Sequence, residues 1–491
     1  MDERGTDEAS IRLEKLHRIA AAGVDPYPAK SAISHKIGEV LMRFDDIAKK
    51  GESVVIGGRL MAQRGHGGAL FADLEDGTGK IQLHLKRDII GAEAFAFFTA
   101  NIDRGDFLQI TGTVFVTKMG EKTIAVSGFT LLSKSLASLP EKWHGLTDTE
   151  IRYRKRYLDL VSNPEVRAIF RKRSLIVQTI REFFAAKGFM EVETPILQPI
   201  AGGATARPFV THHNALDIDL YLRVAPELYL KRLIVGGFER VFEIGRNFRN
   251  EGIDHLHNPE FTSIEAYQAY ADYREHMIMT EELLTLVVGR VNGSPVLEVG
   301  EMKIDFTAPY PRITFRDAVL QYAGVDIEQC PDRASLAKAA ESKGVKVEAK
   351  DDRGAILDNL YKKTVRANIV DPTFVIDHPL ELSPLAKKKP EDGRYVERFQ
   401  LVLGRGIELA NAYSELNDPI DQRRRFEEQE RLRQGGDDEA QHMDLDFVEA
   451  LETGMPPTAG WAIGIDRLVA LLTGSHGLKE VILFPTLRPE K

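Results

Sequence analysis

Apolar and polar residues recur with two different periods along the chain, and each period predicts a different kind of element. Residues 10–22 (SIRLEKLHRIAAA) place apolar side chains at helical spacing, and the DPYP at 25–28 would end that helix. Between residues 53 and 132, short runs rich in β-branched and other apolar residues are separated by glycines. Five such runs within about 80 residues predict a small, closed or nearly closed β-barrel.

From about residue 165 the pattern changes to longer helices that alternate with strands. Residues 165–189 (EVRAIFRKRSLIVQTIREFFAAKGF) carry an apolar stripe at helical spacing. Near the end of the chain, GWAIGIDRLVALLTG at 460–474 has the pattern of a strand that runs into a helix. Strands that run mostly antiparallel, with the helices set apart from them, predict an α+β domain.

These shifts in pattern divide the chain into four parts. We predict an N-terminal helical extension at 1–50, an OB-fold barrel at 51–139, a linker at 140–170 and the α+β domain at 171–491. Charge-rich and mainly helical residues at about 317–370 suit an insertion into that last domain.

Composition limits the class of protein. The 491-residue chain has a formal net charge of −9, which argues against a general polyanion binder, although a local surface can still meet nucleic acid. The single cysteine, Cys330, excludes a disulfide framework and a multi-cysteine zinc site. The first residues, MDERGTDEAS, lack the apolar core of a secretory signal, and no run of about 18 apolar residues predicts a membrane span. We therefore expect a soluble, cytoplasmic protein without membrane contact.

The stretch FRNEGIDHLHNPEFTSIEAY holds charged and aromatic residues on both sides of a predicted loop. Residues two apart share a face of a strand, so Arg249 would project together with Glu251. By the same rule Phe261, Glu265 and Tyr267 would share a face of the returning strand. Taken alone, this stretch also fits a polar sheet face in water, with arginine and glutamate paired across the strands.

The same kind of pattern recurs nearer the end of the chain. NAYSE places Asn411, Tyr413 and Glu415 on one face of another strand, and GIDRL places Arg467 at the start of a helix. This recurrence favours a binding surface over a solvated sheet face.

Three segments resemble, in order, the three motifs of class II aminoacyl-tRNA synthetases: GFMEVETPIL, FRNEG with HNPEFTSIEAY, and GWAIGIDRL. The wording GGATARPFVTHHNALDIDLYLRVAPELYLKRL, together with NAYSELNDP and PPTAGW, is similar to class II lysyl-tRNA synthetases. The resemblance runs from about residue 53 to residue 491. It implies a catalytic domain built on an antiparallel sheet with flanking helices. It also implies activation of lysine by ATP to lysyl-adenylate and pyrophosphate, followed by transfer of lysine to the 3′ end of tRNA(Lys).

For ATP, the resemblance implies Arg249 as a bridge between the lysine carboxylate and the α-phosphate, and Arg467 on the γ-phosphate. A guanidinium suits the bridge because its fork of donors can serve two oxyanions. These two arginines are the expected catalytic residues, because the attack needs two anions brought together and the growing charge neutralised. Phe261 suits stacking on adenine. The full expected ATP set is Arg249, Glu251 (at the exocyclic amine), His257 (near the phosphates), Asn258, Phe261, Glu408 and Arg467.

For lysine, the family's contacts fall on acidic residues of this chain. Glu265, Tyr267 and Glu415 match contacts to the ε-amino group. Buried ammonium groups need carboxylates, because an unpaired buried charge is costly, so glutamates around a small ligand support lysine on physical grounds too. The full expected lysine set is Gly203 and Glu227 (at the α-amino group), Arg249, Glu265, Tyr267, Asn411 (at the carboxylate), Tyr413, Glu415 and Ala462.

Two positions depart from the family pattern. The family holds Mg²⁺ on ATP through two acidic residues, of which Glu408 matches one and the neutral Gln400 stands at the other. The stretch between them is one residue longer than usual, and Glu408 can share a face with Asn411 only if a bulge separates them. At the pocket floor the chain has Ala462 where the family has glycine, and that methyl group would trim the fit of lysine or favour a related ligand.

The resemblance also implies two macromolecular partners. Arg64, Phe71, Gln82 and Glu121 of the barrel fall on positions that read a uridine-rich anticodon, where Phe71 can stack on an unpaired base. A place in the barrel core is the alternative for Phe71. Motif 1, centred on Pro195, is a dimer interface in this class, so we expect a homodimer. From the sequence alone, the helix before it could equally pack internally.

Two further readings stay open at this level. A paralogue could form lysyl-adenylate for a protein acceptor, with Gln400 and Ala462 as signs of drift. A non-catalytic RNA-binding protein could keep the fold. ATP–pyrophosphate exchange would be absent in the non-catalytic RNA-binding protein and present in either enzyme. Charging of tRNA would be absent in the paralogue with a protein acceptor and present in a synthetase.

Overall fold

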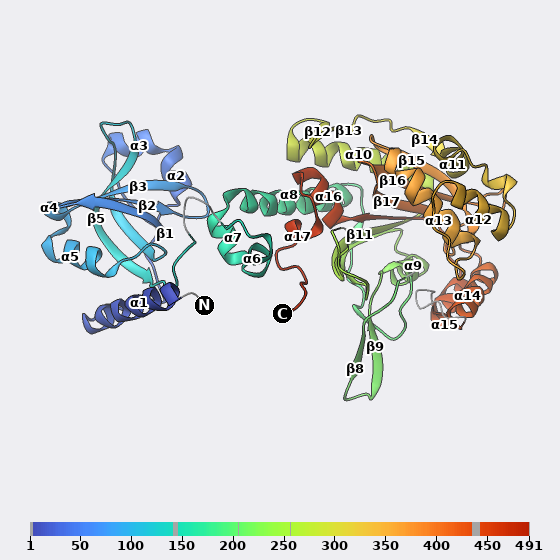
Figure 1. Cartoon of the computed structure of the whole chain (residues 1–491), viewed down its shortest axis with the longest axis horizontal. Coiled ribbons are helices and arrows are strands. Elements are labelled where there is room, and N and C mark those ends of the chain that lie inside the picture. The colour runs from blue at the N-terminus through green and yellow to red at the C-terminus, as the bar shows by residue number, and fades with distance from the viewer. Residues whose placement is uncertain (1–2, 141–145, 205, 256, 435–441, 491) are drawn as a thin grey trace. The chain divides into compact units, whose positions relative to one another are not determined.

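The computed structural model describes residues 3–140, 146–204, 206–255, 257–434 and 442–490. The chain divides into two compact units, Met1–Thr147 and Asp148–Lys491 (Figure 1). Within the described part of the chain, no helix is long and apolar enough to cross a membrane.

The first unit contains a closed barrel with strand order β1-β2-β3-β5-β4, which confirms the predicted OB-type barrel. Its strands alternate between the two faces; in β3, for example, Ile81, Leu83 and Leu85 point into the core. The strands are β1 Ser53–His66, β2 Ala69–Glu75, β3 Lys80–Lys86, β4 Phe107–Val116 and β5 Lys122–Ser133. The helices are α1 Glu3–Ala21, α2 Ile37–Met42, α3 Phe44–Lys50, α4 Arg87–Ile90 and α5 Ala92–Asn101.

Buried charge ties helix α1 to this barrel. Lys134 is fully buried, with its Nζ 2.8 Å from Asp106 Oδ2 and 2.6 Å from Asp103 Oδ2. Lys15 of α1 also pairs with Asp103, at 2.5 Å. The helix is therefore held by a shared ion cluster as well as by apolar packing.

The second unit is built on one eight-stranded sheet with the order β14-β15-β16-β17-β18-β11-β10-β6. All neighbours are antiparallel except the pairs at the two edges, β14 with β15 and β10 with β6. This arrangement confirms the predicted α+β class. The strands are β6 Met190–Glu191, β10 Arg240–Phe248, β11 Glu260–Ala269, β14 Arg312–Thr314, β15 Thr373–Pro379, β16 Tyr395–Leu403, β17 Ile407–Ser414 and β18 Thr458–Gly464.

Helices α8 (Pro164–Ala186), α10 (Tyr273–Asn292) and α16 (Ile465–Thr473) cover one face of the sheet and form the largest apolar core with it. Helices α11 (Phe315–Ala323), α12 (Arg333–Ser342) and α13 (Arg353–Thr364) share a separate core beside β15 and β16. The remaining helices are α6 Thr149–Arg154, α7 Arg156–Ser162, α9 Glu227–Val235, α14 Pro419–Gln434, α15 Leu445–Thr453 and α17 Leu478–Val481, with short 3₁₀ turns at Ile327–Gln329, Arg366–Asn368 and Leu380–Leu382.

A small three-stranded sheet, β7-β9-β8, stands beside the large one, and in Figure 1 its β8–β9 hairpin extends from the body of the second unit. The small strands are β7 Leu197–Gln198, β8 Val210–His213 and β9 Ile218–Leu222, and a separate pair is formed by β12 Val296–Val299 and β13 Met302–Asp305.

A buried arginine fastens the C-terminal segment to α7. Arg156 donates to Asp159 at 2.5 Å and to the carbonyls of Lys479 and Leu483 at 2.8 and 3.0 Å. Neither charged side chain of the pair is more than 1% exposed. Asp159 also accepts from Arg152 at 2.8 Å, so removal of Arg156 takes away one of its two arginine partners.

We predict that Arg156→Met lowers the free energy of unfolding of the second unit by about 3 kcal/mol, because Asp159 loses one of its two arginine partners and the carbonyls of Lys479, Ile482 and Leu483 lose their donor. Arg154→Met is the matched control, since Arg154 pairs with the exposed Glu150 and should cost less than about 1 kcal/mol. Denaturant unfolding of the whole chain measures both. Equal losses in the two variants would contradict the role given to Arg156.

Candidate active site

Two joined pockets lie against strands β11, β17 and β18 of the large sheet. The first has a volume of about 220 Å³ and the second about 350 Å³. Both are lined by Arg249, Glu265, Glu408, Asn411 and Ala462, so these residues mark the place where the pockets meet. The site is therefore one continuous cleft with two ends.

The expected ATP residues all line the first pocket: Arg249, Glu251, His257, Asn258, Phe261, Glu408 and Arg467. Their backbone setting differs from the sequence prediction at one point. Strand β10 ends at Phe248, so Arg249 and Glu251 lie beyond it rather than side by side on a strand face. The chain turns there, because the Glu251 N–H donates to the Arg249 carbonyl at 2.9 Å. Both side chains still reach the pocket.

Arg249 is half-buried where the two pockets meet, and its Cζ lies 5.1 Å from the centre of the Phe261 ring. Burial lowers the pKa of its guanidinium, and Glu251 partly offsets that effect. Among the described residues, its Nε has no hydrogen-bond partner. A half-buried guanidinium whose Nε donor is out of water and free is suited to an anion, because a buried donor without a partner is costly.

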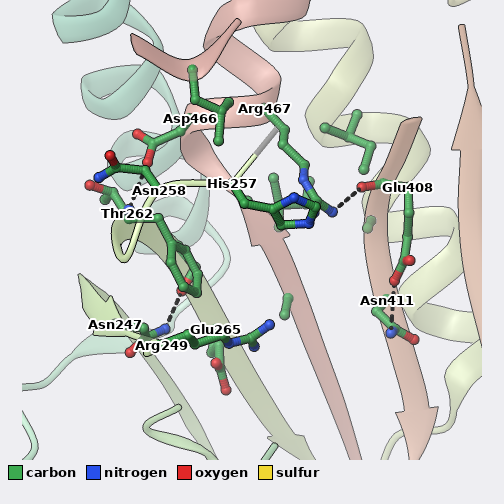
Figure 2. Close-up of a pocket in the computed structure, with 18 of the residues that line it drawn as sticks. Asn247, Arg249, His257, Asn258, Thr262, Glu265, Glu408, Asn411, Asp466 and Arg467 are labelled. Carbon is green, nitrogen blue, oxygen red and sulfur yellow. Dashed lines mark hydrogen bonds between the residues drawn. The ribbon is translucent and has the colours of Figure 1, made fainter. Parts of the chain in front are cut away.

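The roof of the first pocket comes from the start of α16 and from the loop before β11. Arg467 donates to the backbone carbonyl of Glu408 at 3.1 Å. Figure 2 shows Arg249 and Glu265 on one side of the pocket, Glu408 and Asn411 on the other, and Arg467 reaching down from its helix. The arginines thus face one space from two directions, as an elongated polyanion would require.

Two further residues of this roof differ in how firmly they are held. His257 is exposed, and its Nδ1 lies 2.9 Å from Asp254 Oδ2. Asp466 was missed by the sequence reasoning, although it stands within the GIDRL segment. Its carboxylate accepts from the Thr262 N–H at 2.9 Å and pairs with Arg173 at 2.6 Å, so it joins β11 to α16 and α8.

A β-bulge brings Glu408 and Asn411 to one face of the sheet. Without it, residues three apart on a strand would point to opposite faces. Leu401 pairs with Ala410 and Val402 with Glu408, so Leu409 is the extra residue of β17. The Asn411 amide then donates to Glu408 Oε1 at 3.3 Å. The bulge predicted from the sequence is confirmed.

The donor set offers little to a protein-bound metal. Glu408 lines the first pocket, and its Oε2 accepts from Arg366 at 3.3 Å. Gln400 lines neither pocket; it is buried, and its Oε1 has no hydrogen-bond partner among the described residues. In the same part of the chain, no group of three His, Cys, Asp or Glu side chains is placed to hold a metal. One carboxylate fits an Mg²⁺ carried mainly by phosphates and water, which is a usual mode for that ion.

The second pocket is rich in carboxylates. All of the expected lysine residues but one line it: Gly203, Glu227, Arg249, Glu265, Tyr267, Asn411, Tyr413 and Ala462. The exception, Glu415, lies behind Gly460, where a Cβ would come within 1.8 Å of Glu415 Oε1. Burial, followed by the charge of Glu227, raises the pKa of Glu265 to about 8. Such a carboxyl gains strongly from a cationic ligand.

Two cations of the second pocket were also missed by the sequence reasoning. Lys231 is fully buried, with its Nζ 2.6 Å from Glu227 Oε1 and paired with Glu415. Its spacing of four from Glu227 on one helix was the available signal. Arg398 donates to Asn411 Oδ1 at 3.0 Å and so fixes that amide at the junction of the two pockets.

The expected anticodon residues lie on the barrel. Phe71 is half-buried and lies outside the apolar core of the barrel. The alternative that it is a core residue is therefore wrong. Its ring stacks on His84, with centroids 4.4 Å apart, and His84 is 5.9 Å from Phe115. An aromatic ladder therefore runs across three strands. The other expected residues are Arg64 (opposite Phe71 on β1), Gln82 (bonded to Thr123 at 3.0 Å) and Glu121 (next to the start of β5).

Residues 148–488 match the family model "tRNA synthetases class II (D, K and N)", and residues 54–132 match "OB-fold nucleic acid binding domain". The chain belongs to the class II tRNA synthetases. It is 50% identical to a lysine–tRNA ligase of Moorella thermoacetica over 489 residues, which cover 100% of this chain and 99% of the relative. A lysine–tRNA ligase of Carboxydothermus hydrogenoformans is 51% identical over 479 residues, covering 98% and 97%. This class II synthetase is thus a member of the lysine–tRNA ligase family.

We predict that Gly460→Ala abolishes the thermal stabilisation by lysine and leaves that by ATP, because the new Cβ would displace Glu415 and press on Tyr267 at 2.7 Å. Gly464→Ala on the same strand is the control, since its Cβ would meet Arg467 only at ordinary contact distances from 3.7 Å. Differential scanning fluorimetry with each ligand alone reads the result. Unchanged stabilisation by lysine in Gly460→Ala would mean that Glu415 does not shape the ligand pocket.

Proposed function

We propose that the protein is a lysine–tRNA ligase that activates lysine with ATP and transfers it to tRNA(Lys). The observation that carries the proposal is the cleft itself: a pocket with two arginines opens into a pocket with buried glutamates. The first end suits a polyphosphate and the second suits a diamino acid. The 50% identity to lysine–tRNA ligases along the whole chain supports the same reading.

The geometry supports an in-line first step. One oxygen of the lysine carboxylate attacks the α-phosphorus of ATP, and the bond from that phosphorus to the bridging oxygen breaks to release pyrophosphate. Arg249, at the junction of the two pockets, would hold the carboxylate and the α-phosphate together and offset the charge that grows between them. Arg467 would hold the γ-phosphate, and Phe261 would stack on adenine, with Glu251 at its amine.

The second pocket would hold lysine through charge and through fixed hydrogen bonds. Glu227 is suited to the α-ammonium, because Tyr413 already fixes its Oε1 at 2.7 Å. Glu265 and Tyr267, whose side chains lie 3.3 Å apart, would meet the ε-ammonium together with Glu415. Asn411 would meet the carboxylate. Ala462 stands between Glu265 and Asn411 in the sheet register, where its methyl group would limit the floor of the pocket.

Mg²⁺ would arrive with ATP, and Glu408, which lines the first pocket, would hold it. When bound, the ion neutralises phosphate charge. Arg467 and Arg366 are protein cations beside Glu408, so part of this neutralisation is built into the chain. We assign Gln400 no contact with the ion.

In the second step the terminal ribose hydroxyl of the tRNA attacks the carbonyl carbon of lysyl-adenylate, and AMP leaves. The barrel would read the anticodon, with Phe71 as a stacking platform and with Arg64, Gln82 and Glu121 at base edges or phosphates. The stack of Phe71 on His84 supports this role, because it holds the ring on the outer surface of the barrel.

We also infer a homodimer through motif 1. Large apolar side chains are exposed around Pro195 and on the nearby hairpin: Met190, Ile196, Leu197, Val210, Leu216 and Ile218. Such a group favours burial against a partner. Sedimentation should give a mass near twice 55.0 kDa, whereas a monomer at micromolar concentration would refute the inference. Action in the cytoplasm is part of the same proposal.

We predict that the natural protein charges total tRNA with lysine in the presence of ATP and Mg²⁺. We also predict that Ala462→Gly changes kcat/KM for lysine by less than about 200-fold, because one methyl group in a pocket is worth about 1–3 kcal/mol. Filter assays with labelled lysine measure both rates. Lysine-dependent pyrophosphate exchange without charging would shift the acceptor to a protein, and absence of both would favour the non-catalytic alternative.

We predict that Phe71→Leu raises the KM for tRNA(Lys) by at least about fivefold, because stacking on an aromatic ring is worth roughly 1–3 kcal/mol per base. Pyrophosphate exchange should not change, since that step needs no tRNA. Phe107→Leu, at an exposed aromatic position of the same barrel outside the anticodon set, is the control. An unchanged KM in Phe71→Leu would remove Phe71 from the RNA surface.

A further inference from the structure

Lys231 occupies a position in which a charge is costly. It lies one turn after Glu227 on α9, and its side chain is 0% exposed. Its Nζ is also 5.6 Å from the centre of the Tyr413 ring and 5.8 Å from that of Phe447. A fully buried lysine is rare unless it is paired, and an apolar residue of similar volume would fill such a site at lower cost. The charge of Lys231 is therefore explained by the neighbouring carboxylates, which it neutralises in part.

Those carboxylates outnumber the cation. Glu227, Glu265 and Glu415 are all buried around the second pocket, and Lys231 pairs with two of them. When all four groups are ionised, the cluster keeps an excess of two negative charges. Lysine carries two ammonium groups, and its carboxylate has Arg249 as a separate partner. The pocket and the substrate thus balance in charge only because Lys231 is present.

We propose that Lys231 is the resident counter-ion of the lysine pocket: it pairs with Glu415 and Glu227, holds both carboxylates in place, and sets the pocket charge to match a substrate with two ammonium groups. The proposal rests on the proposed function, because it takes lysine as the ligand. It makes Lys231 a positioning and specificity-determining residue that need not touch the substrate.

The pairing also fixes which atoms remain for the ligand. Lys231 takes Oε2 of Glu415, whereas Oε1 points toward Gly460 in the strand that lines the pocket and has no hydrogen-bond partner among the described residues. Within the described ranges of the chain, Glu265 accepts a hydrogen bond from Tyr267 alone. An ε-ammonium can therefore be shared by Glu415 Oε1 and Glu265, while Glu227 remains for the α-ammonium.

Titration of the cluster supports this geometry. Burial raises the pKa of Glu415 well above its usual value, and Lys231 is the main group that opposes the rise. The acids that face this cluster are Glu227 on α9, Glu265 and Tyr267 on β11, and Tyr413 on β17. The charges of Arg249 and Arg223 act on Glu265 and that of Arg398 acts on Tyr413, whereas Lys231 is the cation paired with Glu415. Without Lys231, a proton would have to neutralise Glu415, and lysine could bind only by expelling that proton.

A double-mutant cycle between Lys231→Met and Glu415→Gln tests the proposal, because the change in the KM for lysine caused by Lys231→Met should have opposite signs in the two backgrounds. In the natural background, Lys231→Met should raise the KM for lysine in pyrophosphate exchange by at least about tenfold, the cost of one lost charge-assisted contact. In the Glu415→Gln background the same change should lower that KM, because removal of the cation restores the excess of two negative charges. A role in packing alone would raise the KM in both backgrounds and would overturn the proposal.

Proton uptake gives a second readout. Below pH 8, lysine binding to Lys231→Met should release more protons than binding to the natural chain, as measured by calorimetry in buffers of different ionisation enthalpy. Equal proton release would contradict the proposal. Arg232→Met is the matched control on the same helix: Arg232 pairs with Asp444 outside the pocket, and its loss should leave the KM for lysine within about twofold.

The design separates the possible failures. If the natural chain shows no lysine-dependent pyrophosphate exchange, the proposed function is wrong, and the role of Lys231, which rests on it, falls with it. If Lys231→Met does not fold, Glu415→Gln and the double variant still decide the matter, since the buried pair is neutral in the double variant. A lysine KM for the double variant above that of Glu415→Gln would overturn the proposal.

Discussion

The cost of taking carboxylates out of water is the constraint on which the rest of this structure depends. Glu227 comes from helix α9, Glu265 from strand β11 and Glu415 from the residue just after β17, and each is at least nine-tenths buried. Ionised carboxylates in such a place must be matched by cations, or else they take up protons. Burial does raise the pKa of Glu265 to about 8. The pocket therefore keeps an excess of negative charge until a cationic ligand enters. That excess is what makes the pocket select a cationic ligand.

The sheet supplies the rigidity that this charge arrangement needs. Strand β18 lies between β11 and β17, so Gly460 and Ala462 form a floor against which the acidic side chains converge. On the other side of β18, Trp461 donates to Thr280 of α10 at 2.8 Å. His276 of the same helix is buried, which lowers its pKa to about 4 and keeps it neutral behind the strand. The helices thus hold the floor without adding charge to it.

Much of this could be predicted from the sequence, for reasons that differ between the parts. The barrel followed from glycine-separated apolar runs, and the bulge at Leu409 followed from the parity of Glu408 and Asn411. The alternation of residues in β11 correctly brought Glu265 and Tyr267 to one surface, since side chains of a strand point to two faces in turn.

What pattern could not give was the three-dimensional balance of charge. Lys231 looked like an ordinary helix residue, because its second partner, Glu415, is far away in the sequence. Gln400 stands on β16 at the position of the family's second acidic residue, yet it is buried outside both pockets. Arg249 and Glu251 lie past the end of β10, where a local turn replaces strand geometry. Contacts between distant segments and the exact ends of strands cannot be predicted from the spacing of apolar and polar residues in the sequence.

The most direct test of the central claim is pyrophosphate exchange with lysine and with norleucine, which is nearly the same length but lacks the ε-ammonium. The account predicts a preference for lysine in kcat/KM of at least about 10⁴, because norleucine would leave buried carboxylates unpaired. A preference of about 200-fold or less would contradict it, since apolar fit alone provides a difference of up to about that size.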